Sequence, residues 1–143
     1  MKTITVSQIP VNGEIVINIG QPCNGFIGLA EITLPFYELK GSDVQGYQLD
    51  IVCKDIDCCL LNPERLLRRI LLPKPNWKKS FFKTIEFRNI LFQQIDSCER
   101  KITIQLLDET GAPFAFPKDM FYNKVTVTLA MTNQNNEKSW LFR

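Results

Sequence analysis

The sequence contains no histidine among its 143 residues. Histidine is the usual base in Ser-His-Asp triads and Cys-His pairs, so these nucleophilic arrangements are excluded. Its absence also removes one of the two side chains that most often bind zinc. We therefore expect a protein that is not an enzyme and that needs neither a cofactor nor a metal.

Strong charge and long apolar runs are also missing. The net charge of +2 is too small to predict a nucleic-acid or membrane surface, for which a basic stripe would be expected. No apolar run is long enough to cross a membrane, and no repeat or low-complexity linker divides the chain. A chain of this length forms one domain that can bury a core without disulfides or metals.

The cysteines are odd in number and include no C-x₂-C pair. They are Cys23, Cys53, Cys58, Cys59 and Cys98. The chain starts with Met-Lys-Thr-Ile-Thr-Val rather than an apolar targeting segment, which predicts synthesis in a reducing intracellular compartment. We interpret all of these cysteines as structural thiols rather than as disulfides or metal ligands.

Two alternating stretches between residues 101 and 131 are the clearest strand signals in the chain. Their apolar positions are Ile102, Ile104 and Leu106 in the first stretch, and Val125, Val127 and Leu129 in the second. Alternation of this kind is typical of strands with one buried face. A turn at residues 108–111 and a loop with prolines at both ends lie between them. We predict that the two strands form an antiparallel pair with a long aromatic connection.

Similar β-prone patterns recur through the rest of the chain. They cover residues 3–7, 15–19, 26–34, 47–53, 81–87 and 90–95. The sequence Val11-Asn12-Gly13-Glu14 predicts a hairpin-type turn. Gly28, inside one of these patterns, indicates a β-bulge or a close approach of another backbone segment.

One segment has helical spacing instead. Asn62 resembles an N-cap and Pro63 a first helical residue, with apolar residues following at helical intervals. The pattern predicts a short helix that starts at Pro63 and ends before Pro73. An extended crossover within a β-sandwich is the alternative, because so short a helix is marginal without tertiary support.

These patterns together predict an all-β fold with eight or nine short strands and at most one short helix. A jelly-roll-like or Greek-key β-sandwich is the architecture we expect. Residues 1–131 would form the single domain. Residues 132–143 would form a polar tether with an apolar tip.

Two groups of aromatic and apolar residues are candidates for an interface. They are Phe114, Phe116, Phe121 and Tyr122 in the long loop, and Trp140, Leu141 and Phe142 at the end of the chain. The loop group could fill a pocket of a partner, or it could cap the end of the core, which we favour. The terminal group must bury itself either in its own domain or in another chain, and we favour another chain.

The charged residues give weaker signals. A basic stretch consists of Arg65, Arg68, Arg69, Lys74, Lys78, Lys79 and Lys83. It could meet an anionic surface such as nucleic acid, but we interpret it as a solvated face. The acids Asp43, Asp50, Asp55 and Asp57 do not have the arrangement of a calcium loop, so we predict no metal site there.

One part of the chain resembles a known group of proteins. The order "QLDIVCKDID", "LLRRILLP" and "ITIQLLDETGAPFAFP…VTVTLAM" is similar to the C-terminal part of structural proteins in the viral lineage of Polinton (Maverick) elements and adintoviruses. The resemblance extends over residues 47–131. It implies a virion protein, such as a capsid, vertex or spike component, built on a β-sandwich and without catalytic residues.

The sequence and the resemblance lead to one main hypothesis. The protein would be a non-enzymatic structural protein of a virion that associates with itself and with other coat subunits. The alternative is a cytoplasmic β-sandwich module that binds a ligand or a partner protein. A hydrolase on a β scaffold is a third option that no residue pattern favours.

Overall fold

The computed structural model describes residues 2–35, 46–56, 61–73, 82–97, 99–114 and 124–133. Its strands are β1 (Lys2–Gln8), β2 (Glu14–Asn18), β3 (Cys23–Pro35), β4 (Gly46–Cys53), β5 (Leu66–Pro73), β6 (Phe82–Glu86), β7 (Gln93–Ser97), β8 (Lys101–Leu107) and β9 (Val125–Asn133). No residue in these ranges is helical, and so none belongs to a helix that could span a membrane. The predicted all-β class is confirmed.

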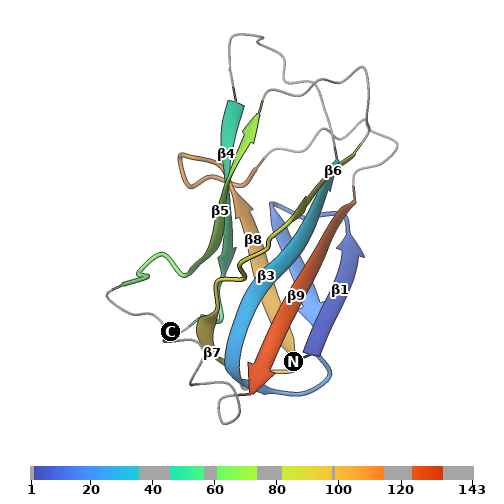
Figure 1. Ribbon diagram of the computed structural model, residues 1–143, viewed down its shortest axis with the longest axis vertical. Helices are drawn as coiled ribbons and strands as arrows, with labels where there is room; N and C mark the ends of the chain where they lie inside the picture. Colours follow the sequence, from blue (N-terminus) through green and yellow to red (C-terminus); the bar gives the residue numbers. More distant parts are fainter. Residues whose placement is uncertain are drawn as a thin grey trace.

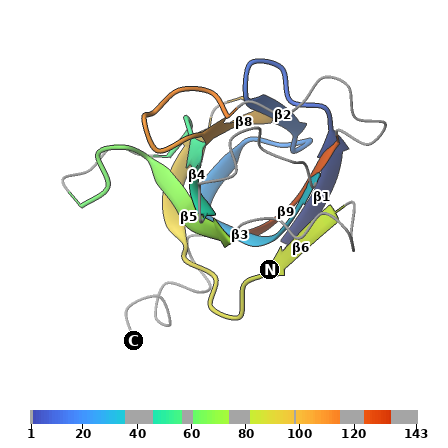
Figure 2. The same cartoon turned by 90° about the horizontal axis from the view of Figure 1, so that it is seen from above.

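The strands form two antiparallel sheets that face each other (Figure 1). Sheet A has the order β1-β9-β3-β6, and β7 pairs with another part of β3. Sheet B has the order β2-β8-β4-β5. Seen from above, the two sheets curve around a common interior (Figure 2). The fold is therefore a β-sandwich, as predicted.

Alternation along the strands builds the core between the sheets. Completely buried aliphatic side chains come from both sheets, among them Ile17, Leu49, Ile51, Ile102, Ile104 and Leu106 from sheet B and Ile27, Ile32, Val125, Val127 and Leu129 from sheet A. Each aliphatic side chain of this size stabilises the fold by roughly 1.5–3 kcal/mol when it leaves water. The inner faces of the two sheets thus supply most of the driving force for folding.

The predicted pairing of residues 101–107 with residues 125–131 is wrong. Both segments are strands with the expected buried faces, but β8 lies in sheet B between β2 and β4, whereas β9 lies in sheet A between β1 and β3. Alternation identifies a strand with one buried face, and two strands that face each other across a core show the same pattern as two that pair. The long connection between the two segments allows them to lie in different sheets.

The strand pairs are nested along the chain. β1 pairs with β9, β2 with β8, β3 with β6 and β7, and β4 with β5. Further pairs, β3 with β9 and β4 with β8, join these ribbons into the two sheets. The chain is therefore one long antiparallel ribbon that ends in the β4–β5 pair, rolled so that successive strand pairs lie alternately in sheet A and sheet B around the core.

The helix predicted from Pro63 is wrong, and the extended alternative describes this segment better. Residues 66–73 form β5, which pairs with β4. A β-bulge leaves Leu67 without a partner, since Ile51 pairs with Arg68 and the next residue of β4 pairs with Leu66. The bulge places Leu67 and Ile70, three residues apart, on the same buried side. Bulged strands can therefore imitate helical spacing.

The predicted turn at residues 11–14 is present, but it does not make a hairpin of β1 and β2. Val11 and Glu14 exchange two main-chain hydrogen bonds of 3.0 Å, and Asn12 and Gly13 have φ values of 53° and 74°. The strands on either side then diverge into different sheets. The turn therefore carries the chain from sheet A to sheet B.

The prediction of a close backbone approach at Gly28 is confirmed. A Cβ atom at this position would collide with Cγ2 of Ile90 and lie 2.9 Å from the carbonyl oxygen of Leu91. The segment between β6 and β7 passes there, which is why β7 begins at Gln93 and not at Ile90 as the sequence indicated. The bulge in β3 occurs nearby, at Ala30.

Candidate interaction site

The aromatic residues proposed for an interface fall mostly outside the described ranges. Phe114 is within them, and it is 8% exposed and belongs to the core. Its N–H donates to the carbonyl of Leu106 at 2.9 Å, at the end of the turn that follows β8. This position fits the capping alternative for Phe114. Phe116, Phe121, Tyr122, Trp140, Leu141 and Phe142 lie outside the described residues.

The turn before Phe114 is held by one carboxylate. Oδ1 of Asp108 accepts hydrogen bonds from the hydroxyl and the N–H of Thr110, at 2.6 and 2.8 Å, and from the N–H of Ala112 at 3.1 Å. These hydrogen bonds hold the pKa of Asp108 below its usual value, and the bond from the Thr110 hydroxyl has the largest effect. Gly111 has a φ of 84°, which confirms the reason for a glycine in the predicted turn.

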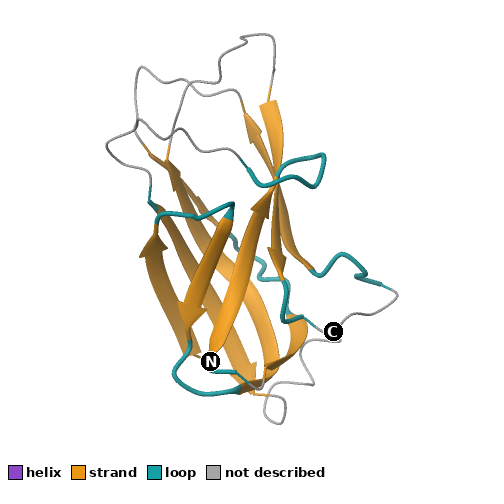
Figure 3. Cartoon of the chain, turned by 180° about the vertical axis from the view of Figure 1, so that it is seen from behind, coloured by secondary structure: helices purple, strands orange, loops and turns teal. Residues whose placement is uncertain are grey.

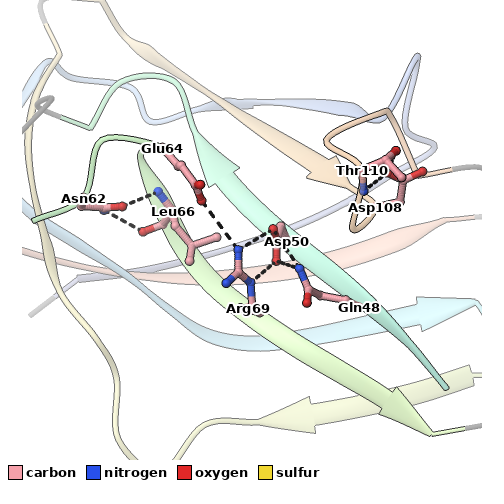
Figure 4. Close-up of polar contacts among 8 residues, drawn as sticks. All are labelled: Gln48, Asp50, Asn62, Glu64, Leu66, Arg69, Asp108 and Thr110. Atoms are coloured by element: carbon pink, nitrogen blue, oxygen red, sulfur yellow. Dashed lines mark hydrogen bonds and ion pairs between the residues drawn. The ribbon is translucent and has the colours of Figure 1, made fainter.

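Two arginines of the basic stretch are held by neighbouring groups. Arg69 donates from Nε and from a terminal nitrogen to the two carboxylate oxygens of Asp50, at 2.8 and 3.0 Å (Figure 4). This bond to Asp50 raises the pKa of the guanidinium. Arg68 lies over the ring of Phe87, 4.3 Å from its centre, and donates to the carbonyl of Asn89 at 3.0 Å. Both side chains therefore have structural partners.

The other residues of the basic stretch lie apart from these two arginines or outside the described ranges. Arg65 is exposed and has a φ of 56°. Lys83 lies in β6, on the opposite sheet from the arginines. Lys74, Lys78 and Lys79 lie outside the described residues. The described part of the stretch is thus divided between the two sheets.

The acids and cysteines do not converge on a metal site in the described ranges. Asp50 is engaged by Arg69, whereas Asp55 accepts the N–H of Thr103 at 2.9 Å. The thiol of Cys53 is fully buried, and this burial raises its pKa to about 12. Asp43, Asp57, Cys58, Cys59 and Cys98 lie outside the described residues.

An open groove of about 900 Å³ lies beside β2. It is lined by residues from three places in the chain: Gln8, Val16, Asn18, Gly20, Glu99, Arg100 and Lys101. The side chain of Gln8 crosses from β1 to donate to the carbonyl of Val16 at 2.7 Å. Carboxylate, guanidinium, ammonium and amide groups here could bind a polar ligand.

Sheet B has two edges, and they differ in how their main chain is covered. At the β2 edge, Val11 satisfies both main-chain groups of Glu14, and Gln8 satisfies the carbonyl of Val16. At the β5 edge, the carboxamide of Asn62 satisfies both groups of Leu66, accepting its N–H and donating to its carbonyl, each at 2.9 Å (Figure 4). Asn62 therefore replaces a neighbouring strand, but only at the start of β5.

Further along β5, the side chains of Arg69 and Leu71 are exposed. Leu71 is 78% exposed, although it lies within a strand. β8 pairs with β4 only over Asp50–Cys53, so the other half of the β4–β5 pair extends past the rest of sheet B (Figure 3). The β4–β5 hairpin, residues 46–53 and 66–73, is thus the part of the described fold whose main chain is best placed to bind another strand.

Sequence reasoning missed this edge because it assigned a helix there. The segment does carry a signal, since Leu66–Pro73 is rich in aliphatic residues and ends in proline, as edge strands often do. The Asp50–Arg69 pair was not foreseen either, because it depends on the pairing of β4 with β5.

No protein-family model matches the sequence, and a search of curated proteins finds no similar one.

Proposed function

We propose that this protein is a non-enzymatic structural subunit of a virion, acting by self-association and by docking to other coat subunits. The observation that carries the proposal is the nested strand pairing. A rolled antiparallel ribbon that forms two facing sheets is the arrangement of the jelly roll, a fold that recurs in viral capsid domains. The sequence resemblance over residues 47–131 points to the same class.

The strand order supports the jelly roll in detail. Every connection from β1 to β4 crosses between the sheets, the β4–β5 connection stays in sheet B, and the chain then returns through β6 and β7, β8 and β9. In a jelly roll the two edge strands of each sheet remain available for contacts with neighbours. Here those edges are β1 on one side of sheet A, β6 and β7 on its other side, and β2 and β5 in sheet B.

Assembly of the full chain in solution tests this proposal. Native mass spectrometry and negative-stain electron microscopy of the purified protein should reveal closed rings or shells whose masses are multiples of 16.5 kDa. A protein that stays monomeric in every buffer tested would contradict it.

The groove beside β2 favours a second candidate, a β-sandwich module that binds a polar ligand. Its volume of about 900 Å³ is within the range of small-molecule sites, and Arg100 and Asn18 supply donors. A thermal-shift screen with soluble saccharides and nucleotides tests this option. Stabilisation that disappears in Arg100→Ala, in a protein that remains monomeric, would favour the binding module over the coat subunit.

A further inference from the structure

We infer that the β5 edge binds the β5 edge of a second copy of this chain, antiparallel and around a two-fold axis at Ile70. This inference rests on the proposed self-association and names the surface that carries out one of its contacts.

The hydrogen bonds around β4 determine those directions. Cys53 donates to the carbonyl of Arg65, and Lys54 donates to the carbonyl of Thr103. Odd-numbered residues of β4 therefore bond to β5 and even-numbered residues to β8, because the two sides alternate along a strand. Leu49, which pairs with Ile70, bonds to β5, whereas Asp50, which pairs with Arg69, does not.

The outward groups of β5 follow from the same alternation. Leu66, Arg69, Leu71 and Pro73 direct their main chain away from β4. Leu66 is already satisfied by Asn62, and Pro73 has no N–H. No described residue bonds to the outward groups of Arg69 and Leu71. These two residues therefore form the open part of the edge.

One two-fold register matches these two open residues to each other. With Ile70 opposite Ile70 of the second copy, Arg69 of each copy lies opposite Leu71 of the other, and each such pair exchanges both main-chain hydrogen bonds. Moving the two-fold axis by one residue, to Arg69, changes the register by two residues and places the Arg69 residues opposite each other, so that like charges meet. The opposite shift places Arg69 against Pro73, which cannot donate. Sheet B would then continue across the two copies.

The other strand edges are less suited to bind a second copy. Among the strand residues whose side-chain burial is described, large apolar side chains are exposed only at Val16 and Leu71. Val16 lies on β2, where Val11 already bonds to both main-chain groups of Glu14 and Gln8 donates to the carbonyl of Val16. β1 presents Thr3, Thr5 and Ser7 instead. The β5 edge therefore combines an exposed apolar side chain with open main-chain groups.

Hydrogen exchange of the unmodified full chain tests this inference directly. From about 1 μM to about 1 mM protein, a range chosen for a small interface, the amides of Arg69 and Leu71 should become at least about tenfold more protected. The amide of Ile70, which bonds within the hairpin, should be protected at both concentrations. Light scattering should report masses that rise toward twice 16.5 kDa or a multiple of it.

A matched pair of variants provides the second measurement. Leu71→Lys places a cation opposite Arg69 of the second copy and should raise the dissociation constant by about tenfold or more. Leu61→Lys, at a turn residue that is 97% exposed, should leave it unchanged. Circular dichroism of each variant confirms that it is folded.

The outcomes separate this inference from the proposed function. Assembly without concentration-dependent protection of Arg69 and Leu71, or with equal effects of the two lysine variants, would overturn the β5 contact and leave a coat role intact. A chain that stays monomeric at about 1 mM would overturn both.

Discussion

The outer faces of the two sheets satisfy their polar side chains in different ways. On sheet A, hydroxyls pair with each other across strands: Thr5 with Thr128 and Ser7 with Thr126, each at 2.9 Å, and Thr33 with Thr84 at 3.0 Å. On sheet B, ions pair: Asp50 with Arg69 at 2.8 Å and Glu14 with Lys54 at 2.6 Å. The hydrogen-bonded pairs on sheet A are neutral and those on sheet B are charged, so salt and pH should weaken mainly the pairs of sheet B.

Substitutions on the buried inner faces should have the largest effect on stability, and the effect should be the same in both sheets. Ile104→Asp in sheet B and Val127→Asp in sheet A each bury a carboxylate at a site with 0% exposure. This costs several kcal/mol, comparable with the roughly 5–15 kcal/mol total stability of a domain. Both variants should fail to fold, as judged by soluble expression and circular dichroism, whereas Thr126→Asp on the outer face should fold. Tolerance of either buried aspartate would contradict the assigned core.

Gly28→Ala tests the segment that crosses sheet A at that position. The added methyl would collide with Ile90 and approach the carbonyl of Leu91, and overpacking of this kind costs about 1–3 kcal/mol. Urea unfolding should therefore show a lower midpoint. Gly20→Ala is a control for substitution of a glycine at an open site, although its φ of 76° adds strain of its own. An unchanged midpoint in Gly28→Ala would mean that the crossing segment moves away easily.

Asp50→Asn weakens the charged pairing on sheet B. The bidentate contact to Arg69 is lost, and we expect the melting temperature to fall by a few degrees in low salt and by less in high salt, where screening already weakens the pair. Thr126→Val on sheet A is the matched comparison, because it removes a neutral bond to Ser7. Its effect should not depend on salt. Equal salt dependence of the two variants would remove the distinction between the faces.

Glu86→Lys should stabilise the protein slightly. Glu31 and Glu86 are directly paired between β3 and β6, the one place on sheet A where described acids lie opposite each other. Like charges at opposed positions destabilise a sheet by roughly 0.2–1 kcal/mol, and a lysine would reverse the sign. Calorimetry should show a small rise in melting temperature. A fall would indicate that both carboxylates have other partners.

Glu14→Gln should alter the response to acid. The hydrogen bond from Lys54 lowers the pKa of Glu14, so the ionised form stabilises the fold above the ordinary glutamate value of about 4.3. This contribution disappears as the pH falls through the lower pKa of the folded state. The melting temperatures of the wild type and Glu14→Gln should therefore converge in acid and differ near neutral pH. A constant difference across this range would contradict the assignment.

The positions of strands were more predictable than their partners. Alternation located β8 and β9 almost to the residue, since one face of each must be buried. It could not assign them to different sheets, because a facing strand and a pairing strand bury the same positions. The helix predicted from Pro63 failed for a related reason, since a bulge at Leu67 changes the spacing of buried residues from two to three.

The candidate site was harder to foresee than the fold. Asn62 was predicted to cap the start of a helix, whereas its carboxamide bonds to the main chain of Leu66 at a strand edge. The open groups of Arg69 and Leu71 depend on which side of β5 faces β4, and this is decided by pairing that local sequence does not encode. Phe114 alone, of the aromatic candidates, lies where the structure can assign it a role, and that role is in the core.

The position of β9 has a consequence for biosynthesis. β9 pairs on both sides, with β1 and β3, and the Thr5–Thr128 bond joins residues 123 positions apart. At roughly 5–20 residues per second, a ribosome needs on the order of ten seconds to make the chain between them. Until then β1 and β3 lack the strand that joins them, and their edges and apolar faces are open to other nascent chains on the same message. Sheet A can therefore be completed only after translation of β9, and a cell that makes many copies at once must keep these intermediates apart.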